Sequence, residues 1–492
     1  SDLVIYRWMC QNMDNKNIIL TNMAWRFGER VGAQGVKLLV EIVLARLLLP
    51  DDYGLIALVT VFIAILNVFV DSGLGNALIQ KKDADDLDFS SVFWFNIVWC
   101  IFLYIILFLV SPYIAAYYER QELVPVVRIL GLQVIISGVK NVQQAYISRT
   151  LQFRRFFFAT IGGTLGAAGI GILMAYHGYG IWALVTQQIF NVLVDTIILW
   201  ITVKWRPAWR FSISRLKVLF SFGWKMLASA LIDTVYSEIR QLIIGKFYTP
   251  DNLAYYNRGQ QFPALFVGNV NNAIDSVLLP TMSKEQDDKG RIKSMTRRAI
   301  KTSTYIMAPF LMGLAFIADT VVEVILTEKW LECVPFLQIF CIVFMFYPIH
   351  TANLNAIKAM GRSDLFLKLE VIKKGVGIVL LLSTMWFGVM AMAYSMLVSS
   401  ITSQIINSWP NRKLLQYGYL EQLKDILPSI LLAVFTGACA GLIGMLDLPL
   451  GFTLFAQVAL GAEIYIIGSA ALRLDSFDYL RRLLKSVLKK DF

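Results

Sequence analysis

The sequence is poor in charged residues and in histidine. Of its 492 residues, 16% are Asp, Glu, Lys or Arg and two are His, whereas 57% are hydrophobic and the mean hydropathy is +0.62. Soluble domains carry roughly 25% charged residues. A single soluble core is excluded as well, because such cores stop growing near about 250–300 residues. The chain is therefore expected to be an integral membrane protein.

Cysteine is also scarce, and no cluster of metal ligands is visible. His177 and His350 are far apart in the chain, and no two cysteines show C-x-x-C spacing. The five cysteines are Cys10, Cys100, Cys333, Cys341 and Cys439. This pattern argues against a disulfide framework and against a zinc-type site. We expect no metal and no cofactor.

The amino-terminal residues 1–17 lack the order of basic, apolar and small residues that marks a cleavable signal. The first transmembrane helix is therefore expected to direct insertion. The formal net charge of +11 does not indicate a nucleic-acid partner, because the basic residues punctuate apolar runs instead of gathering on one solvated face. In a membrane protein, such an excess follows from the positive-inside rule.

Apolar stretches of about 20 residues, the length that spans a bilayer, recur along the whole chain. They predict an all-α polytopic membrane protein with about 14 transmembrane helices and no sizeable soluble domain. The expected helices lie near residues 22–48, 54–79, 89–111, 124–147, 156–176, 180–203, 219–246, 253–280, 299–326, 332–357, 366–386, 389–409, 427–445 and 451–472.

The distribution of basic residues predicts the orientation. With a cytoplasmic amino terminus, about 31 of the 45 Lys and Arg residues fall on the inner side, in segments such as 204–217, 283–301 and 481–490. Only Arg120 and Lys329 fall in outer links. By the positive-inside rule, both termini are expected to be cytoplasmic.

Two pairs of segments suggest an internal repeat. LLLPDDYGL (residues 47–55) resembles FYTPDNLAY (247–255), and LQFRRFFF (151–158) resembles AMGRSDLF (359–366) at a similar offset. Repeats of this kind are typical of transporters that alternate access around a central site. They predict two six-helix lobes in parallel repeat, followed by two additional helices.

The predicted division of the chain follows from this repeat. The expected parts are an amino-terminal lobe at residues 1–210, a second lobe at 211–415, and a last part at 416–492 that ends in a basic amphipathic tail. We expect that tail to lie on the anionic inner leaflet.

The first expected helix carries a polar stripe. At 100° per residue, Arg26, Arg30, Gln34, Lys37 and Glu41 fall within an arc of about 80°. A charge at the bilayer centre is unfavourable by about 2.5 kcal/mol or more, so the stripe should face a wet cavity or another charge. Alternatively, the two arginines snorkel to the cytoplasmic interface while the lysine pairs with the glutamate at i,i+4.

Fainter polar faces follow on three more helices. The second helix aligns Thr60 and Asn67 with Asp71, for which an ion pair with a neighbouring helix is the alternative. The seventh aligns Asp233 with Arg240. The eighth carries a looser stripe whose members are Arg258, Gln261, Asn269, Asn272 and, at its edge, Asp275. Packing contacts are the alternative role for the amides.

The sign of these charges indicates the ligand. Cations outnumber acids on the polar faces, so we expect a cationic cavity that binds an anion such as a phosphate or a pyrophosphate. The candidate substrate-binding residues are Arg26, Arg30, Lys37, Arg46, Arg240 and Arg258. The acids Glu41, Asp71 and Asp233 are candidates for binding a coupling ion or for ion pairing.

Four segments carry a resemblance to a known family. VLARLLLPDDYGLIALV (Val43–Val59), FVDSGLGNALIQKKD (Phe69–Asp83), AYISRTLQFRR (Ala145–Arg155) and TEKWLECVPFLQIFCI (Thr327–Ile342) resemble the polysaccharide-transporter branch of the multidrug/oligosaccharidyl-lipid/polysaccharide exporter superfamily. That branch contains the Wzx-type flippases, including colanic-acid exporters. The resemblance extends over essentially the whole chain.

The resemblance implies an alternating-access flippase, not an enzyme. Its implied substrate is an undecaprenyl-diphosphate-linked oligosaccharide used for bacterial surface polysaccharide, in the cytoplasmic (inner) membrane, with coupling to H⁺ or Na⁺ as a secondary expectation. The implied partners are this substrate, membrane lipids, and the polymerase and glycosyltransferases of the same pathway. Two alternatives remain open: a cation-coupled drug antiporter of the same superfamily, and a membrane-embedded polysaccharide polymerase or ligase.

Overall fold

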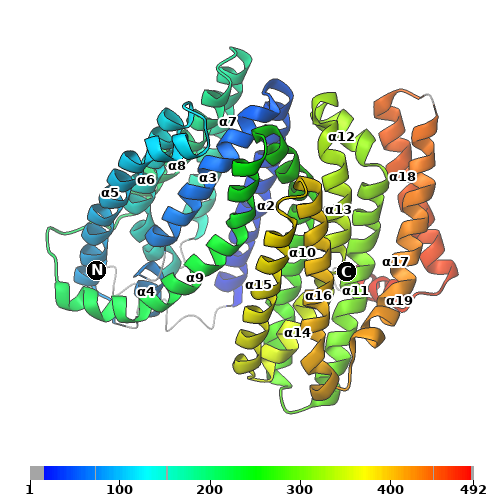
Figure 1. The fold of residues 1–492 in the computed structure, drawn as a ribbon. Helices are drawn as coiled ribbons and strands as arrows, with labels where there is room; N and C mark the ends of the chain where they lie inside the picture. The colour runs from blue at the N-terminus through cyan, green and yellow to red at the C-terminus, as the bar shows by residue number, and fades with distance from the viewer. Residues whose placement is uncertain (1–15, 72–73, 82, 151–152, 447, 489–492) are drawn as a thin grey trace. The chain divides into compact units, whose positions relative to one another are not determined.

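The computed structural model describes the backbone of residues 16–71, 74–81, 83–150, 153–446 and 448–488 (Figure 1). Within these residues the regular structure is entirely helical, which confirms the predicted all-α fold. Packing divides the chain into two compact units, Ser1–Leu253 and Ala254–Phe492. The three-part division predicted from the sequence stays a prediction.

Unit 1 contains the helices that precede the boundary. They are α2 (Lys16–Leu47), α3 (Pro50–Asp71), α4 (Leu74–Gln80), α5 (Asp86–Tyr117), α6 (Leu123–Thr150), α7 (Phe153–Tyr176), α8 (Ile181–Thr202) and α9 (Ile213–Phe247). Within this unit α7 packs on both α2 and α8, α6 packs on α5 and α8, and α3 packs on α6 and α9.

Unit 2 contains almost all of α10 and the helices that follow it. They are α10 (Pro250–Lys284), α11 (Lys289–Phe316), α12 (Ala318–Leu326), the 3-10 helix η1 (Glu328–Cys333), α13 (Val334–Met345), α14 (Tyr347–Ala359), α15 (Ser363–Thr384), α16 (Val389–Leu414), α17 (Tyr419–Leu442), the 3-10 helix η2 (Ile443–Met445), α18 (Leu450–Ala471) and α19 (Asp475–Leu488). The helix α17 packs mainly on α11, and α18 packs on α17.

The helices begin at residues that satisfy free backbone amides. At the start of α5, the Asp85 carboxylate accepts from the Asp88 amide and the Asp88 carboxylate accepts from the Asp85 amide, which is a capping box. Both α3 and α10 begin at a proline, a residue without an amide hydrogen to satisfy. Local sequence therefore sets these boundaries.

Ten helical segments of the described chain are long and apolar enough to cross a membrane, or eleven when α9, bent by 51° near residue 222, is included. The helices α2, α10 and α15 have 32, 35 and 22 residues but contain more charged or polar residues. The multi-pass membrane fold is confirmed, whereas the predicted count of about 14 spans stays a prediction.

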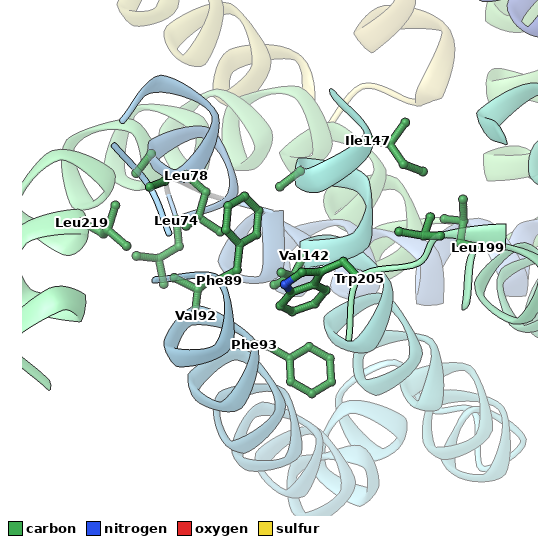
Figure 2. Close-up of a cluster of buried hydrophobic side chains, with 14 of the residues drawn as sticks. Leu74, Leu78, Phe89, Val92, Phe93, Val142, Ile147, Leu199, Trp205 and Leu219 are labelled. Carbon is green, nitrogen blue, oxygen red and sulfur yellow. The ribbon is translucent and has the colours of Figure 1, made fainter. Parts of the chain in front are cut away.

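Each unit has an apolar core at one end of its helices. In unit 1, Trp205 is buried with Phe89 and Phe93 at ring-centroid distances of 5.8 and 6.2 Å, and Val142 lies close by (Figure 2). In unit 2 the corresponding cluster includes Tyr417, which is fully buried. These cores hold together the ends of helices that are otherwise distant in the sequence.

Candidate functional site

The polar stripe of α2 is described in part. The side chains of Arg26 and Arg30 lie outside the described residues. Lys37 is 70% exposed, and its ammonium lies 3.8 Å from the Glu41 carboxylate, the i,i+4 pair considered above. Arg46 is exposed in the last turn of α2. The described part of the stripe therefore contains one cation, Lys37, beside one acid, Glu41.

The polar face of α3 is less exposed. The Thr60 hydroxyl donates to the Ala57 carbonyl at 2.8 Å, as packing residues in membrane helices do. The Asn67 Oδ1 atom is buried without a hydrogen-bond partner in the part of unit 1 that is described. The side chain of Asp71 lies outside the described residues.

Among the cations of the predicted set whose side chains are described, Arg240 on α9 has buried nitrogens without a partner. Its Nε and Nη1 atoms are buried and have no hydrogen-bond partner among the described residues of the protein. Asp233, two turns earlier on α9, is exposed. An unpartnered buried charged donor is unfavourable by several kcal/mol, so this guanidinium is suited to an anionic ligand.

Arg258, in unit 2, has a different environment. It is 6% exposed, its Nη1 atom donates to the Gln261 Oε1 atom at 2.5 Å, and its guanidinium lies 5.4 Å from the ring centroid of Trp330. A guanidinium over an indole ring is a favourable cation–π arrangement. Arg258 is therefore held in place by unit 2 itself.

A buried ion pair that sequence reasoning missed lies in unit 1. The Lys140 Nζ atom on α6 is 2.9 Å from Asp195 Oδ2 on α8, and the side chains are 17% and 13% exposed. Gly163 on α7 packs against Asn191 and Asp195, so the pair lies where three helices meet. Its signal in the sequence is a single acid inside the apolar α8 and a lysine inside α6, which also carries Arg128 and Arg149 nearer its ends.

A second missed group lies in unit 2 on α15, where Lys368, Glu370, Lys373 and Lys374 fall within two turns. The Lys373 ammonium is 2.6 Å from the Glu370 carboxylate, and the side chains are 13% and 27% exposed. The neighbouring α14 contributes His350, whose Nδ1 atom lies 3.0 Å from Asn407 Nδ2 on α16. Ionisable groups inside a span are candidate functional residues by default.

Two of the segments that carry the family resemblance, residues 69–83 and 145–155, meet at one end of unit 1. Arg149 donates to the carbonyls of Leu78 and Lys81 at 2.8 and 2.5 Å, and the Lys81 ammonium is 2.6 Å from the Asp88 carboxylate. Arg215 approaches the same carboxylate at 3.6 Å. The Asp88 side chain is fully buried, so these cations form a network that ties α4, α5, α6 and α9 together.

The Asp85 carboxyl belongs to this network. Burial raises its pKa, but the hydrogen bond from the Asp88 amide and the charge of Arg215 more than offset that effect, so its pKa lies below the ordinary value. Asp85 is therefore ionised at neutral pH and keeps Arg215 in place.

A cavity of about 270 Å³ lies at the other end of unit 1. It is lined by Gly54, Leu55, Leu58, Tyr118, Glu119, Arg120, Gly245, Lys246, Tyr248, Thr249, Pro250 and Leu253. Both of its cations are paired, because Arg120 lies 3.4 Å from Asp51 and Lys246 lies 3.3 Å from Glu119. Neither of the two cations that line the cavity is therefore left without an acidic partner.

Known proteins share both sequence and fold with this chain. Residues 43–335 match the family described as polysaccharide biosynthesis protein. The chain is 28% identical to the teichuronic acid biosynthesis protein TuaB of Bacillus subtilis, over 76% of this chain and 78% of that protein. It is 23% identical to the lipopolysaccharide biosynthesis protein WzxC of Escherichia coli, over 80% and 79%.

A solved structure of the lipid II flippase MurJ, in an inward closed conformation, superposes with a TM-score of 0.74. The sequences are 14% identical, and the match covers 92% of this chain and 98% of that one. At 14% sequence identity, this similarity shows a shared fold and no more. The resemblance predicted from the four segments is confirmed by the family match.

Proposed function

This chain belongs to the family of polysaccharide biosynthesis proteins, and on that premise we propose that it is a flippase of lipid-linked oligosaccharide. It is a multi-pass transporter rather than an enzyme. The substrate proposed is an undecaprenyl-diphosphate-linked oligosaccharide, moved across the bacterial cytoplasmic membrane by alternating access. Both termini are proposed to be cytoplasmic, because the basic residues of the links are concentrated on that side.

The observation that carries the proposal is Arg240. Its Nε and Nη1 atoms are buried on α9 and find no partner among the described residues, and a diphosphate provides the acceptors that a guanidinium binds best. The remaining proposed substrate-binding cations are Arg26, Arg30, Lys37, Arg46 and Arg258. Of these, Lys37 and Arg46 are exposed, whereas Arg258 is held by Gln261.

The proposed coupling or ion-pairing acids are Glu41, Asp71 and Asp233. Glu41 has the Lys37 ammonium 3.8 Å away. A drug antiporter of the same superfamily would need an acidic cavity for its cationic substrate. The described cations of α2 and α9 favour an anionic substrate instead.

The test replaces Arg240 and measures transport of a lipid-linked oligosaccharide in proteoliposomes. Arg240→Gln should lower the initial rate of translocation at least about tenfold, because the charged hydrogen bonds to the diphosphate are lost. Arg240→Lys should retain part of the rate, since it keeps the charge but not the bidentate geometry.

Arg412→Gln is the matched control, because Arg412 is an exposed arginine in the last turn of α16. It should transport at the wild-type rate. If Arg240→Gln, at normal abundance, also kept that rate, Arg240 would not be part of the site. If the folded wild-type protein translocated no lipid-linked oligosaccharide, the flippase assignment itself would be wrong.

A further inference from the structure

The connection between α8 and α9 is fixed to the end of unit 1. We call residues 203–221, up to the bend of α9, the strap. The Ala208 amide donates to the Ser90 hydroxyl at 2.9 Å, the Ser212 amide donates to Ser91 at 3.0 Å, and the Trp94 indole donates to the Ala208 carbonyl at 2.9 Å. These hydrogen bonds hold the strap against the start of α5.

The strap includes the first turns of α9. These turns contact α4 and α5 at the lower end of unit 1 as drawn in Figure 1. Leu219 in these turns is buried in the apolar core with Leu74 and Leu78 (Figure 2). Beyond residue 221 the helix turns by 51° into the long apolar segment Gly223–Phe247. The strap thus lies where the membrane-spanning helices of unit 1 end.

The five cations of the strap fall into two groups. Arg206 donates to the carbonyls of Val203 and Trp205 at 2.5 and 2.7 Å, which caps the carboxyl end of α8. Arg215 pairs with Asp85 at 3.4 Å. These two cations are used by the fold.

The other three cations are Lys204, Arg210 and Lys217. All three are exposed, and none has an ion pair within the described residues. No acidic side chain occurs between residues 203 and 221. The exposed face of the strap is therefore purely cationic.

Large apolar side chains alternate with these cations. Trp209 is 88% exposed and stacks on Trp94 with a ring-centroid distance of 4.4 Å. The other exposed apolar side chains of the strap are Phe211 (50%), Ile213 (62%), Val218 (61%) and Phe220 (46%). Exposed aromatic and aliphatic groups interleaved with Lys and Arg are the pattern of a segment that lies in the membrane interface.

We propose that the strap is a binding surface for the headgroups of anionic phospholipids in the leaflet on the cytoplasmic side, with Lys204, Arg210 and Lys217 contacting their phosphates. A lipid occupant fits better than a soluble protein because the exposed Trp and Phe lie at the ends of spanning helices, the depth at which aromatic side chains enter the headgroup layer. The leaflet follows from the proposed orientation of the chain, and the lipid site is independent of which substrate is transported.

The experiment compares lipid selectivity of the full chain in vesicles of phosphatidylcholine and phosphatidylglycerol at a 7:3 ratio. Spin-labelled forms of the two lipids report, by electron spin resonance, the relative association constant of phosphatidylglycerol over phosphatidylcholine. Each basic residue near an anionic surface contributes about 1 kcal/mol, or about fivefold. The variant K204Q/R210Q/K217Q should therefore lose at least about fivefold of this selectivity.

Two matched variants make the result specific. The control K284Q/K289Q/K413Q removes the same charge from exposed lysines of unit 2 and should keep the selectivity, and K204R/R210K/K217R should keep it as well. Unchanged selectivity in the strap variant would overturn the proposal, and that is also the outcome if the cations bind a soluble protein. An equal loss in the unit 2 control would overturn it too, since net charge alone would then account for the effect.

Discussion

At the scale of single residues, the Lys140–Asp195 pair shows what a sequence can hide. Asp195 is the single charge of α8, and Lys140 is one of three cations spread along α6, so helical periodicity does not predict the 2.9 Å contact between them. Lys37 and Glu41 were visible because four residues separate them on one helix. Their i,i+4 contact is present at 3.8 Å. Contacts within a helix follow from spacing, whereas contacts between helices require the fold.

Removing one partner of the Lys140–Asp195 pair should destabilise the protein strongly. Asp195→Asn or Lys140→Met leaves an uncompensated buried charge and should lower the free energy of unfolding by about 3–5 kcal/mol. The double variant Lys140→Met/Asp195→Leu should recover most of that loss. Thermal unfolding in detergent measures both effects.

The same double variant separates a structural role from a transport role. If it is stable and still translocates lipid-linked oligosaccharide, the pair only holds α6 against α8. If it is stable but inactive, the pair takes part in transport. Single variants as stable as the wild type would contradict the burial of the pair.

At the scale of elements, helix existence followed from the sequence, but helix interruptions did not. The predicted helix at 299–326 is divided into α11 and α12, and that at 332–357 into η1, α13 and α14. The length of an apolar stretch predicts a transmembrane span whether or not its helix is interrupted. The bilayer requires only that the backbone N–H and C=O groups have hydrogen-bond partners. The packing of α17 along α11 was equally invisible, because it depends on close contacts such as that of Gly437 with Phe316.

The docking of α19 on unit 2 should depend on Asp475 and not on pH near neutrality. A 2.7 Å hydrogen bond from Lys301 lowers the pKa of the Asp475 carboxyl below its ordinary value of 3.8. The stabilisation is present at pH values above 3.8 and is lost only as the pH falls through the still lower pKa of the folded protein. Amide-exchange protection of α19, corrected for intrinsic rates, should therefore be constant from about pH 5 to 8.

Asp475→Asn should lower that protection at neutral pH, by a modest amount because the carboxylate is 81% exposed. Asp478→Asn is the control on the same helix, three residues further on. Protection that rose or fell between pH 5 and 8 in the wild type would show that a group other than Asp475 controls the docking.

At the scale of the whole molecule, the internal repeat has a structural counterpart. The two repeat segments, residues 47–55 and 247–255, have the same backbone layout. In each, one helix ends, two residues lie outside the helices, and the next helix begins at a proline, Pro50 or Pro250. The two connections also touch, because a side chain at Gly54 would overlap the Pro250 backbone. The sequence predicted the repeat, but the contact between its two copies depends on the packing of α3 against α9.

Gly54→Val should separate these two connections. The added side chain has no room against the Pro250 backbone, and overpacking of this kind raises the energy by about 1–3 kcal/mol. The buried Leu58, which lines the cavity beside Gly54, should become reachable. Leu58→Cys should then react about tenfold faster with an impermeant maleimide when combined with Gly54→Val.

Gly169→Val is the matched control, since a side chain at Gly169 meets nothing within 4 Å. It should leave the labelling rate of Leu58→Cys unchanged. Equal rates with and without Gly54→Val would mean that the contact between the connections does not cover the cavity.

The charges of α2 and α15 also affect the insertion of these helices into the membrane during synthesis. Each charge at the centre of a span opposes release from the translocon into lipid by about 2.5–3.5 kcal/mol, and α2 carries Lys37 and Glu41 inside the helix. Its packing partner α7 begins at Phe153, more than 100 residues later in synthesis. The helix α2 must therefore wait beside the translocon until α7 has left the ribosome, whereas α15 needs only the next helix, α16. Unit 2 contains a similar delay for another pair, because α17, the main packing partner of α11, begins more than 100 residues after α11 ends.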